Sequence, residues 1–292
     1  IGNYGINLED NESDTPKVRG FIVREKCSFP NNFRCEIGLE DYLKQNKIIG
    51  LEGIDTRALT KVLRNNGTMK GIISLEHENL EEVEEKIKAF SNKEAVSIVS
   101  TKKPYTIEGT GKHVAIMDFG IKSNIIRNFK KRNCKITVFP MTATAEEVLS
   151  VNPDLVFLSN GPGDPEDLGT VIENVKKIVG VKPIVGICLG HQLLALTLGG
   201  KTTKLKFGHR GCNHPVKDLE RNRVHITSQN HGYVVDELPE GVVATHVNIN
   251  DGTIEGMKHT TLPIYSVQFH PEAAAGPKDS EYIFDRFMEY AL

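Results

Sequence analysis

The sequence predicts an α/β protein in two parts, a larger domain with an open, mostly parallel sheet flanked by helices and a smaller α/β domain before it. Short apolar, β-branched runs alternate with helical patterns after residue 112, which predicts parallel strands joined by helices on both faces. Residues 101–111, TKKPYTIEGTG, are polar and contain one proline and two glycines, so we expect a linker there. The smaller domain is therefore expected at residues 1–100 and the larger at residues 112–292.

Apolar periodicity and turn residues predict the elements of the larger domain. Thr144 and Glu147 form a capping-box pattern, which marks the start of one helix. Residues 183–187 form a strand that leads into an apolar helical pattern ending at Gly199. The other expected elements are strands at 113–118, 135–139, 154–158, 224–227, 242–248 and 264–269, and helices at 121–132, 170–178 and 279–290.

The first hundred residues carry weaker signals. The best defined helix follows Asp55 or Thr56, either of which can cap it, and Gly67 comes after its end. We expect strands at 20–24 and 71–75, and helices at 39–45, 55–64 and 80–90.

One cysteine stands where a predicted strand turns sharply into a helix. Cys188 lies between Gly186 and Gly190 in the pattern G-x-C-x-G. The glycines remove the Cβ atoms that would block so tight a turn, and the N-terminus of the following helix stabilises a thiolate. Two interpretations are open, a nucleophilic cysteine and a buried core cysteine.

His270 and Glu272 lie two residues apart near the carboxyl terminus, on a segment that Pro271 holds extended. Their side chains can face the same way. A carboxylate beside an imidazole fixes its tautomer and stabilises the imidazolium, which a general base serving a cysteine requires. A strand end with a surface ion pair is the alternative.

Gly161 and Gly163 flank Pro162 directly after the strand expected at 154–158. Their exposed backbone N–H groups can stabilise the oxyanion of a tetrahedral intermediate, although the segment is also an ordinary turn. Phosphate binding is the weaker interpretation, because the chain contains no G-x-x-x-x-G-K-[ST] sequence.

The three segments together resemble the class I, or triad, glutamine amidotransferases, and the resemblance covers residues 112–292. That family has an N-G-P-G-D-P loop, a G-I-C-L-G-H-Q elbow and a late H-P-E, in this order. The resemblance implies that Cys188 is the nucleophile, His270 the acid and base, and Glu272 its orienting partner. It also implies a set of residues that contact glutamine or its oxyanion, namely Gly161, Gly163, Leu189, Gln192, Asn230, Gly232 and Tyr233.

Residues 54–60, IDTRALT, resemble the amino-terminal domain of the carbamoyl-phosphate synthetase small-subunit family. This resemblance implies that ammonia passes to a large synthetase subunit, which makes carbamoyl phosphate for pyrimidine and arginine biosynthesis. ATP and a divalent metal are expected only on that partner, and no cofactor in this chain. Small subunits usually start several dozen residues earlier, with a β-rich segment that contributes a serine to glutamine binding. Because this chain opens at Ile1, we expect its amino-terminal domain to be incomplete.

Two other functions stay open. A stand-alone γ-glutamyl hydrolase would use the same triad and would need neither the first hundred residues nor a partner. A partner-binding regulatory subunit would be a pseudoenzyme that has lost a triad residue, whereas Cys188, His270 and Glu272 are all present.

Composition favours a soluble cytoplasmic protein. A formal net charge of -2 gives no reason to expect nucleic acid or an anionic membrane surface as a partner. Five cysteines without framework spacing favour free thiols in a reducing compartment. His209, Cys212 and His214 have side chains that bind zinc, but a closed site needs four ligands and no second pair is evident. We therefore expect no metal there, and a loop packed near the active site.

Overall fold

A computed structural model describes residues 5–74 and 79–291 of the chain. The chain divides into two compact units, Ile1–Ser91 and Asn92–Leu292. Residues 101–111, expected as a linker, instead carry strand β3 (Tyr105–Ile107), which pairs antiparallel with β5 (Lys135–Pro140) in the second unit. A polar sequence suits this position because an edge strand has one unpaired, solvent-facing side.

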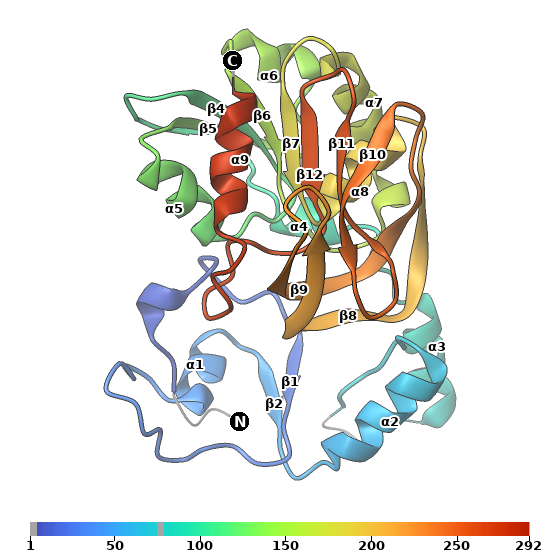
Figure 1. Cartoon of the computed structure of the whole chain (residues 1–292). Helices are drawn as coiled ribbons and strands as arrows, with labels where there is room; N and C mark the ends of the chain where they lie inside the picture. The colour runs from blue at the N-terminus through green and yellow to red at the C-terminus, as the bar shows by residue number, and fades with distance from the viewer. Residues whose placement is uncertain (1–4, 75–78, 292) are drawn as a thin grey trace. The chain divides into compact units, whose positions relative to one another are not determined.

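The centre of the second unit is a run of parallel strands (Figure 1). Parallel neighbours require crossover connections, which are usually helical. The strands lie in the order β5, β4 (His113–Asp118), β6 (Leu155–Leu158), β7 (Ile184–Ile187) and β12 (Ile264–Val267). The helices that follow β4, β5, β6 and β7 in the chain are α5 (Ser123–Lys131), α6 (Ala145–Ser150), α7 (Gly169–Ile178) and α8 (Leu189–Thr197).

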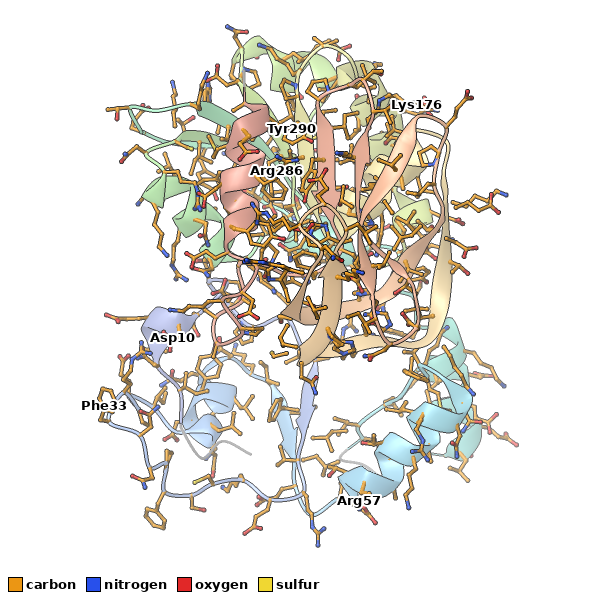
Figure 2. All side chains as sticks on the ribbon, viewed as in Figure 1. Asp10, Phe33, Arg57, Lys176, Arg286 and Tyr290 are labelled. Atoms are coloured by element: carbon orange, nitrogen blue, oxygen red, sulfur yellow. The ribbon has the colours of Figure 1, made fainter. Side chains whose placement is uncertain are left out.

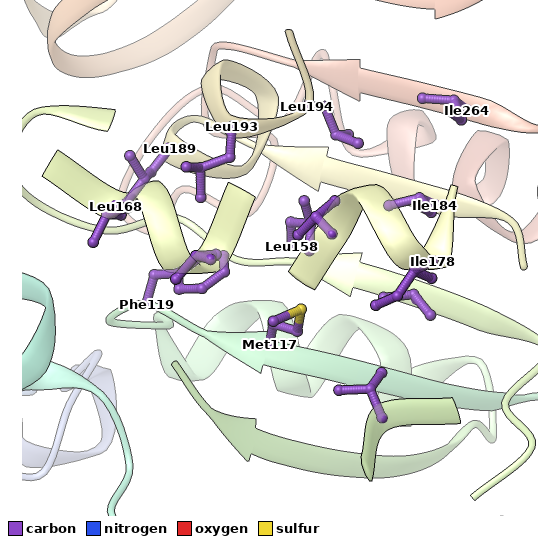
Figure 3. Close-up of a cluster of buried hydrophobic side chains, with 14 of the residues drawn as sticks. Met117, Phe119, Leu158, Leu168, Ile178, Ile184, Leu189, Leu193, Leu194 and Ile264 are labelled. Atoms are coloured by element: carbon purple, nitrogen blue, oxygen red, sulfur yellow. The ribbon is translucent and has the colours of Figure 1, made fainter. Parts of the chain in front are cut away.

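Alternate residues of the parallel strands face two separate hydrophobic cores. On β4, Ala115 and Met117 pack in a core shared with α6, α7 and α8. Val114 and Ile116 pack in the other core, with α5 and the terminal helix α9 (Tyr282–Tyr290). Figure 3 shows the first core, where Met117 lies among apolar side chains from the neighbouring strands and helices. Helices therefore cover both faces of the parallel strands.

The expected open, mostly parallel sheet is wrong beyond β12, where every further strand pairing is antiparallel. Because β10 pairs with both β8 and β11, four strands close into a ring. The sheet is therefore mixed, with a barrel-like part beside the parallel one. The ring consists of β8 (Lys201–Asp218), β9 (Arg223–Glu237), β10 (Val242–Asn248) and β11 (Ile254–His259).

Strand β8 contains the segment 206–215, KFGHRGCNHP, which we expected as a loop. Its pairing with β9 shifts register between Lys204 and His209 and again between Gly211 and His214. Gly208 and Gly211 have φ angles of 72° and 138°, which residues other than glycine rarely adopt. The segment is thus an irregular strand whose bulges the glycines permit.

The first unit, taken by itself, has a small parallel sheet of β1 (Gly20–Ile22) and β2 (Ile49–Leu51). Asp55 caps helix α2 (Thr56–Asn66) by accepting a hydrogen bond from the Ala58 N–H at 2.9 Å, as the sequence predicts. The strand expected at 71–75 is absent from residues 71–74, and residue 75 lies outside the described residues. The other helices of this unit are η1 (Leu8–Asp10), α1 (Leu39–Gln45) and α3 (Leu80–Ala89). The second unit also contains two short helices, α4 (Ala95–Val99) and η2 (Pro165–Leu168).

Little of the first unit is buried. Val23 is the only hydrophobic side chain classed as buried among the unit's described residues. Phe33 is 99% exposed and projects away from the ribbon in Figure 2. The well-packed cores thus lie in the second unit, around the parallel strands.

Replacing Phe157 on β6 tests this core. The ring is fully buried and meets the rings of Phe129 and Phe287 edge-on, with centroids 5.1 and 5.9 Å away. Phe157→Ala should lower the free energy of unfolding by about 3–5 kcal/mol in urea denaturation, because it leaves a cavity. Phe207→Ala is the control, since Phe207 is 52% exposed; it should change the value by less than about 0.5 kcal/mol. Equal effects of the two substitutions would contradict this packing.

Candidate active site

Cys188 occupies a strained turn between β7 and α8. Its φ of 55° and ψ of -103° lie outside the regions that non-glycine residues normally adopt. Its N–H donates to the Val267 carbonyl on β12 at 2.9 Å, so the sheet holds the turn in place. The side chain is only 3% exposed. This position, at the carboxyl end of a parallel strand, is where α/β sheets bind ligands.

The flanking glycines let helix α8 approach the end of β6. A Cβ on Gly190 would lie 2.2 Å from the Leu158 carbonyl oxygen, and one on Gly186 would lie 2.9 Å from the Gly190 carbonyl carbon. The Gly190 N–H also donates to the Ser159 carbonyl at 3.1 Å. A side chain at either position would push α8 away from the sheet.

His270 and Glu272 form a buried pair just beyond β12. Nδ1 of His270 lies 2.7 Å from Oε1 of Glu272, and the two residues are 3% and 1% exposed. The His270 N–H donates to the Ser228 carbonyl of β9 at 2.9 Å. The Cys188 thiol is close enough to this imidazole to raise its pKa. The expected pairing of His270 with Glu272 is therefore present, with the Cys188 thiol as a further neighbour, while the catalytic roles of the three residues stay a prediction.

The charges of this group favour an imidazolium. Burial alone would lower the pKa of His270, but the negative charge of Glu272 and the interaction with Cys188 raise this pKa to about 9. Burial would raise the pKa of Glu272, but the positive charges of His270 and Lys122 bring it down to about 2. At neutral pH, His270 is thus positively charged and Glu272 negatively charged.

Lys122 is a charged neighbour that sequence reasoning missed. Its Nζ lies 3.0 Å from Oε1 of Glu272 and 3.2 Å from Nδ1 of His270. Its charge stabilises the carboxylate and opposes the imidazolium, so it limits the rise of the His270 pKa. One feature of the sequence could have indicated this role. Lys122 follows β4, and the loop after β4 lies at the same edge of the sheet as the turn at Cys188. The Asn160 side chain accepts from the Lys122 backbone N–H at 3.2 Å.

The loop after β6 packs against the start of α8. A Cβ on Gly161 would lie 2.4 Å from the Phe119 carbonyl oxygen and 2.7 Å from a methyl group of Leu189. Gly163, two residues later, has a φ of 95° that favours glycine. Leu189 is the first residue of α8, where backbone N–H groups have no partner within the helix. The structure brings the two segments together, while the oxyanion role of their N–H groups stays a prediction.

The other predicted glutamine contacts lie on α8 and β9. Nε2 of Gln192 donates to the Tyr233 carbonyl at 2.7 Å and to Oε1 of Gln268 at 2.9 Å. Burial and the neighbouring Asp164 carboxylate in the loop after β6 raise the pKa of the Tyr233 hydroxyl to about 12. Asn230 is exposed and Gly232 half-buried, both between Ser228 and Tyr233. Strand β9 thus links His270, α8 and the loop.

Two family models match the chain. Residues 115–290 match the model described as glutamine amidotransferase class-I, and residues 1–73 match the model of the carbamoyl-phosphate synthase small chain, CPSase domain. The chain is 75% identical to the carbamoyl phosphate synthase small chain of Clostridium perfringens, over 100% of this chain and 84% of that relative. The chain belongs to the carbamoyl phosphate synthase small chain family. The resemblance inferred from its motifs is confirmed.

A second relative agrees with this family assignment. The chain is 50% identical to the carbamoyl phosphate synthase pyrimidine-specific small chain of Bacillus subtilis, over 99% of this chain and 80% of that relative. A crystal structure of a candidate GMP synthase component from Thermoplasma acidophilum matches with a TM-score of 0.56. It is 23% identical and covers 62% of this chain and 95% of that one, so the likeness shows the fold alone.

Two further observations concern the cysteines and the helices of the chain. The five cysteines are all free, as their spacing predicts. Within residues 5–74 and 79–291, no helix combines the length and the apolar character needed to cross a membrane.

The identity of the nucleophile can be tested by alkylation with a glutamine-analogue electrophile such as 6-diazo-5-oxonorleucine. Peptide mass spectrometry should find the adduct on Cys188 alone, because binding of the analogue places its reactive carbon at that sulfur. Cys188→Ser should abolish glutaminase activity, whereas Cys212→Ser, which removes an exposed thiol, should retain it. Labelling spread evenly over Cys27, Cys35, Cys134, Cys188 and Cys212 would overturn the assignment.

The Glu272 carboxylate should matter through the charge of His270. Glu272→Gln should keep glutamine binding but lower turnover on the order of 10²-fold, and His270→Asn should lower it further because the acid and base is lost. In the parent, kcat/KM should fall as the pH rises through about 9, where His270 loses its proton. In Glu272→Gln this fall should move to lower pH, because the charge that raises the His270 pKa is gone. Glutamine's own amino group titrates equally in both proteins, so identical alkaline limbs would refute the role of Glu272.

Proposed function

We propose that this chain hydrolyses glutamine to glutamate and ammonia, and that the ammonia passes to the large chain of a carbamoyl phosphate synthase. The observation that carries the hydrolytic part is the position of His270, between the Glu272 carboxylate and the Cys188 sulfur at a strained strand-to-helix turn. The family of the chain supports the second part.

The first half of the reaction forms a thioester. The Cys188 sulfur attacks the carboxamide carbon of glutamine, and backbone N–H groups of Gly163 and Leu189 donate to the oxyanion that forms. Collapse of this intermediate breaks the carbon–nitrogen bond, and the His270 imidazolium gives its proton to the departing ammonia. Glu272 keeps the imidazole oriented through the bond at Nδ1.

The second half releases glutamate. His270, now neutral, takes a proton from water as the water oxygen attacks the thioester carbon. The carbon–sulfur bond breaks, and the sulfur leaves as a thiolate beside the imidazolium that has just formed. The site thereby returns to its starting charge state without a cofactor, so we assign ATP and a divalent metal to the large chain.

Glutamine would be held by Gly161, Gln192, Asn230, Gly232 and Tyr233. Both amide hydrogens of Gln192 are donated within the protein, to Tyr233 and to Gln268. Its amide oxygen is therefore the atom that can accept a hydrogen bond from the substrate. We also place the chain in the cytoplasm, because five free cysteines suit a reducing compartment. The product would serve pyrimidine and arginine biosynthesis.

Coupling to the partner can be measured directly. Adding the cognate large chain with bicarbonate and ATP should raise glutamine turnover about tenfold, because the partner favours the productive arrangement of the triad. Ammonia release is the readout. Cys188→Ser is the control, since it should co-purify with the large chain but release no ammonia. If the chain neither co-purifies with a large chain nor changes its rate, a stand-alone hydrolase becomes the better account.

A further inference from the structure

Two histidines and a glutamate converge inside the ring of antiparallel strands. His209 on β8 and His231 on β9 are direct partners in the pairing of these strands, and their rings lie 4.9 Å apart. Glu255 joins them from β11. One donor atom of each residue lies within 4.8 Å of the others. The three residues are 8%, 5% and 0% exposed, so this is an internal group.

The outward-facing nitrogen of each imidazole has an acceptor. Nε2 of His209 lies 2.7 Å from a carboxylate oxygen of Asp251, and Nδ1 of His231 lies 2.8 Å from the Tyr233 carbonyl oxygen. When each of these nitrogens carries the single proton of a neutral ring, the lone pair is on the inward-facing nitrogen. Imidazoles that bind metals are typically held in this way, by a carboxylate or a backbone carbonyl at the other nitrogen.

The inward-facing nitrogen of His209 meets an acceptor instead of a donor. This atom, Nδ1, is buried, has no hydrogen-bond partner among the described residues, and lies 3.5 Å from Oε1 of Glu255. In a neutral ring a lone pair and a carboxylate oxygen thus face each other in a buried place. Either a second proton on the imidazole, which the neighbouring Glu255 and Asp251 favour by raising the His209 pKa, or a metal cation between the two atoms relieves this contact.

The inward-facing nitrogen of His231 also faces a hydrogen-bond acceptor. Its Nε2 lies 3.0 Å from Oε1 of Gln229. The orientation of that amide is fixed, because its Nε2 donates to Glu255 at 2.9 Å and to the Thr227 hydroxyl at 3.1 Å. The Thr227 hydroxyl in turn gives its own hydrogen to the His214 carbonyl at 3.0 Å, so it can only accept from Gln229. Two unfavourable contacts therefore face the same space.

We propose that His209 Nδ1, His231 Nε2 and the Glu255 carboxylate bind one divalent transition-metal ion, for which Zn²⁺ is the best match. Two imidazoles and one carboxylate are a zinc donor set, and water or the Gln229 amide oxygen can complete a tetrahedron. Donor atoms around such an ion are about 3.3 Å apart. Small side-chain rotations bring donors that lie within 4.8 Å of one another to that spacing.

This donor set shares only His209 with the group His209, Cys212 and His214 that the local sequence pattern offers. Cys212 is exposed, and its sulfur lies 3.7 Å from the Ser228 hydroxyl. The ion would act on glutamine through β9, because His231 lies between Asn230 and Tyr233. It takes no part in the proposed triad chemistry, so the two proposals can fail separately.

The test measures metal binding in the Cys188→Ser background, which removes the triad thiol that would otherwise compete for zinc. Protein is dialysed against chelator-buffered Zn²⁺, and bound metal is measured by inductively coupled plasma mass spectrometry. One ion per chain is expected. Glu255→Gln should weaken binding at least 100-fold, and Asp251→Asn, which removes the partner of His209, about 10–100-fold. A matched control, Cys212→Ser with His214→Asn, should bind as the background does.

A second readout is the melting temperature. Zn²⁺ should raise it in the Cys188→Ser background and in the control but not in Glu255→Gln, because only a folded cluster binds the ion. This comparison stays informative if Glu255→Gln is itself less stable, since each protein is compared with and without metal. The proposal is overturned by the absence of a stoichiometric ion, by equal binding in Glu255→Gln, or by loss of binding in the control. Protons rather than a metal would then occupy the cluster.

Discussion

The site depends on the contact between the first turn of α8 and the end of β6. Gly190 meets the Leu158 carbonyl so closely that no side chain fits, and its N–H bonds to Ser159. This contact fixes the direction of α8 and with it the turn at Cys188, whose conformation costs about 1–3 kcal/mol. The pairing of β7 with β12 holds that strain through the bond from the Cys188 N–H to Val267. The same pairing sets the distance from the sulfur to His270, because His270 lies three residues after Val267, the last residue of the neighbouring strand β12.

The charges at the proposed triad show how a buried ion pair can be maintained. Removing Glu272 from water is costly, and its Oε2 has no hydrogen-bond partner among the described residues. The opposite charges of His270 and Lys122 outweigh this cost, because Nδ1 of His270 and Nζ of Lys122 both lie within hydrogen-bond distance of Oε1. A partly exposed Lys122 also keeps the His270 pKa from rising further, so the imidazolium can still give up its proton. The group is thus arranged for proton transfer more than for stability.

The parts of the fold that the sequence predicts are those with local causes. Strand β4 begins and ends where expected, and the capping box of Thr144 and Glu147 makes both of its hydrogen bonds at the start of α6. The proposed triad could be inferred for the same reason, since the G-x-C-x-G turn and the H-P-E segment are each only a few residues long. Lys122 was not, because it meets His270 across 148 residues of chain and follows β4 without any pattern of its own. The pairing that turns an open sheet into a ring is equally non-local.

Strand β8, and β9 beyond the strand expected at 224–227, escaped sequence analysis because their buried positions are polar. Thr227, Gln229 and His231 alternate on β9 and are 0%, 2% and 5% exposed, where an ordinary strand would carry apolar side chains. Buried polar groups persist when hydrogen bonds satisfy them or when a function requires them. Here hydrogen bonds connect Gln229 to Glu255, and His231 to the Tyr233 carbonyl, which also receives the Gln192 amide. The departure from apolar alternation and the binding surface proposed for glutamine therefore have one physical origin, a polar network that places β9 against α8.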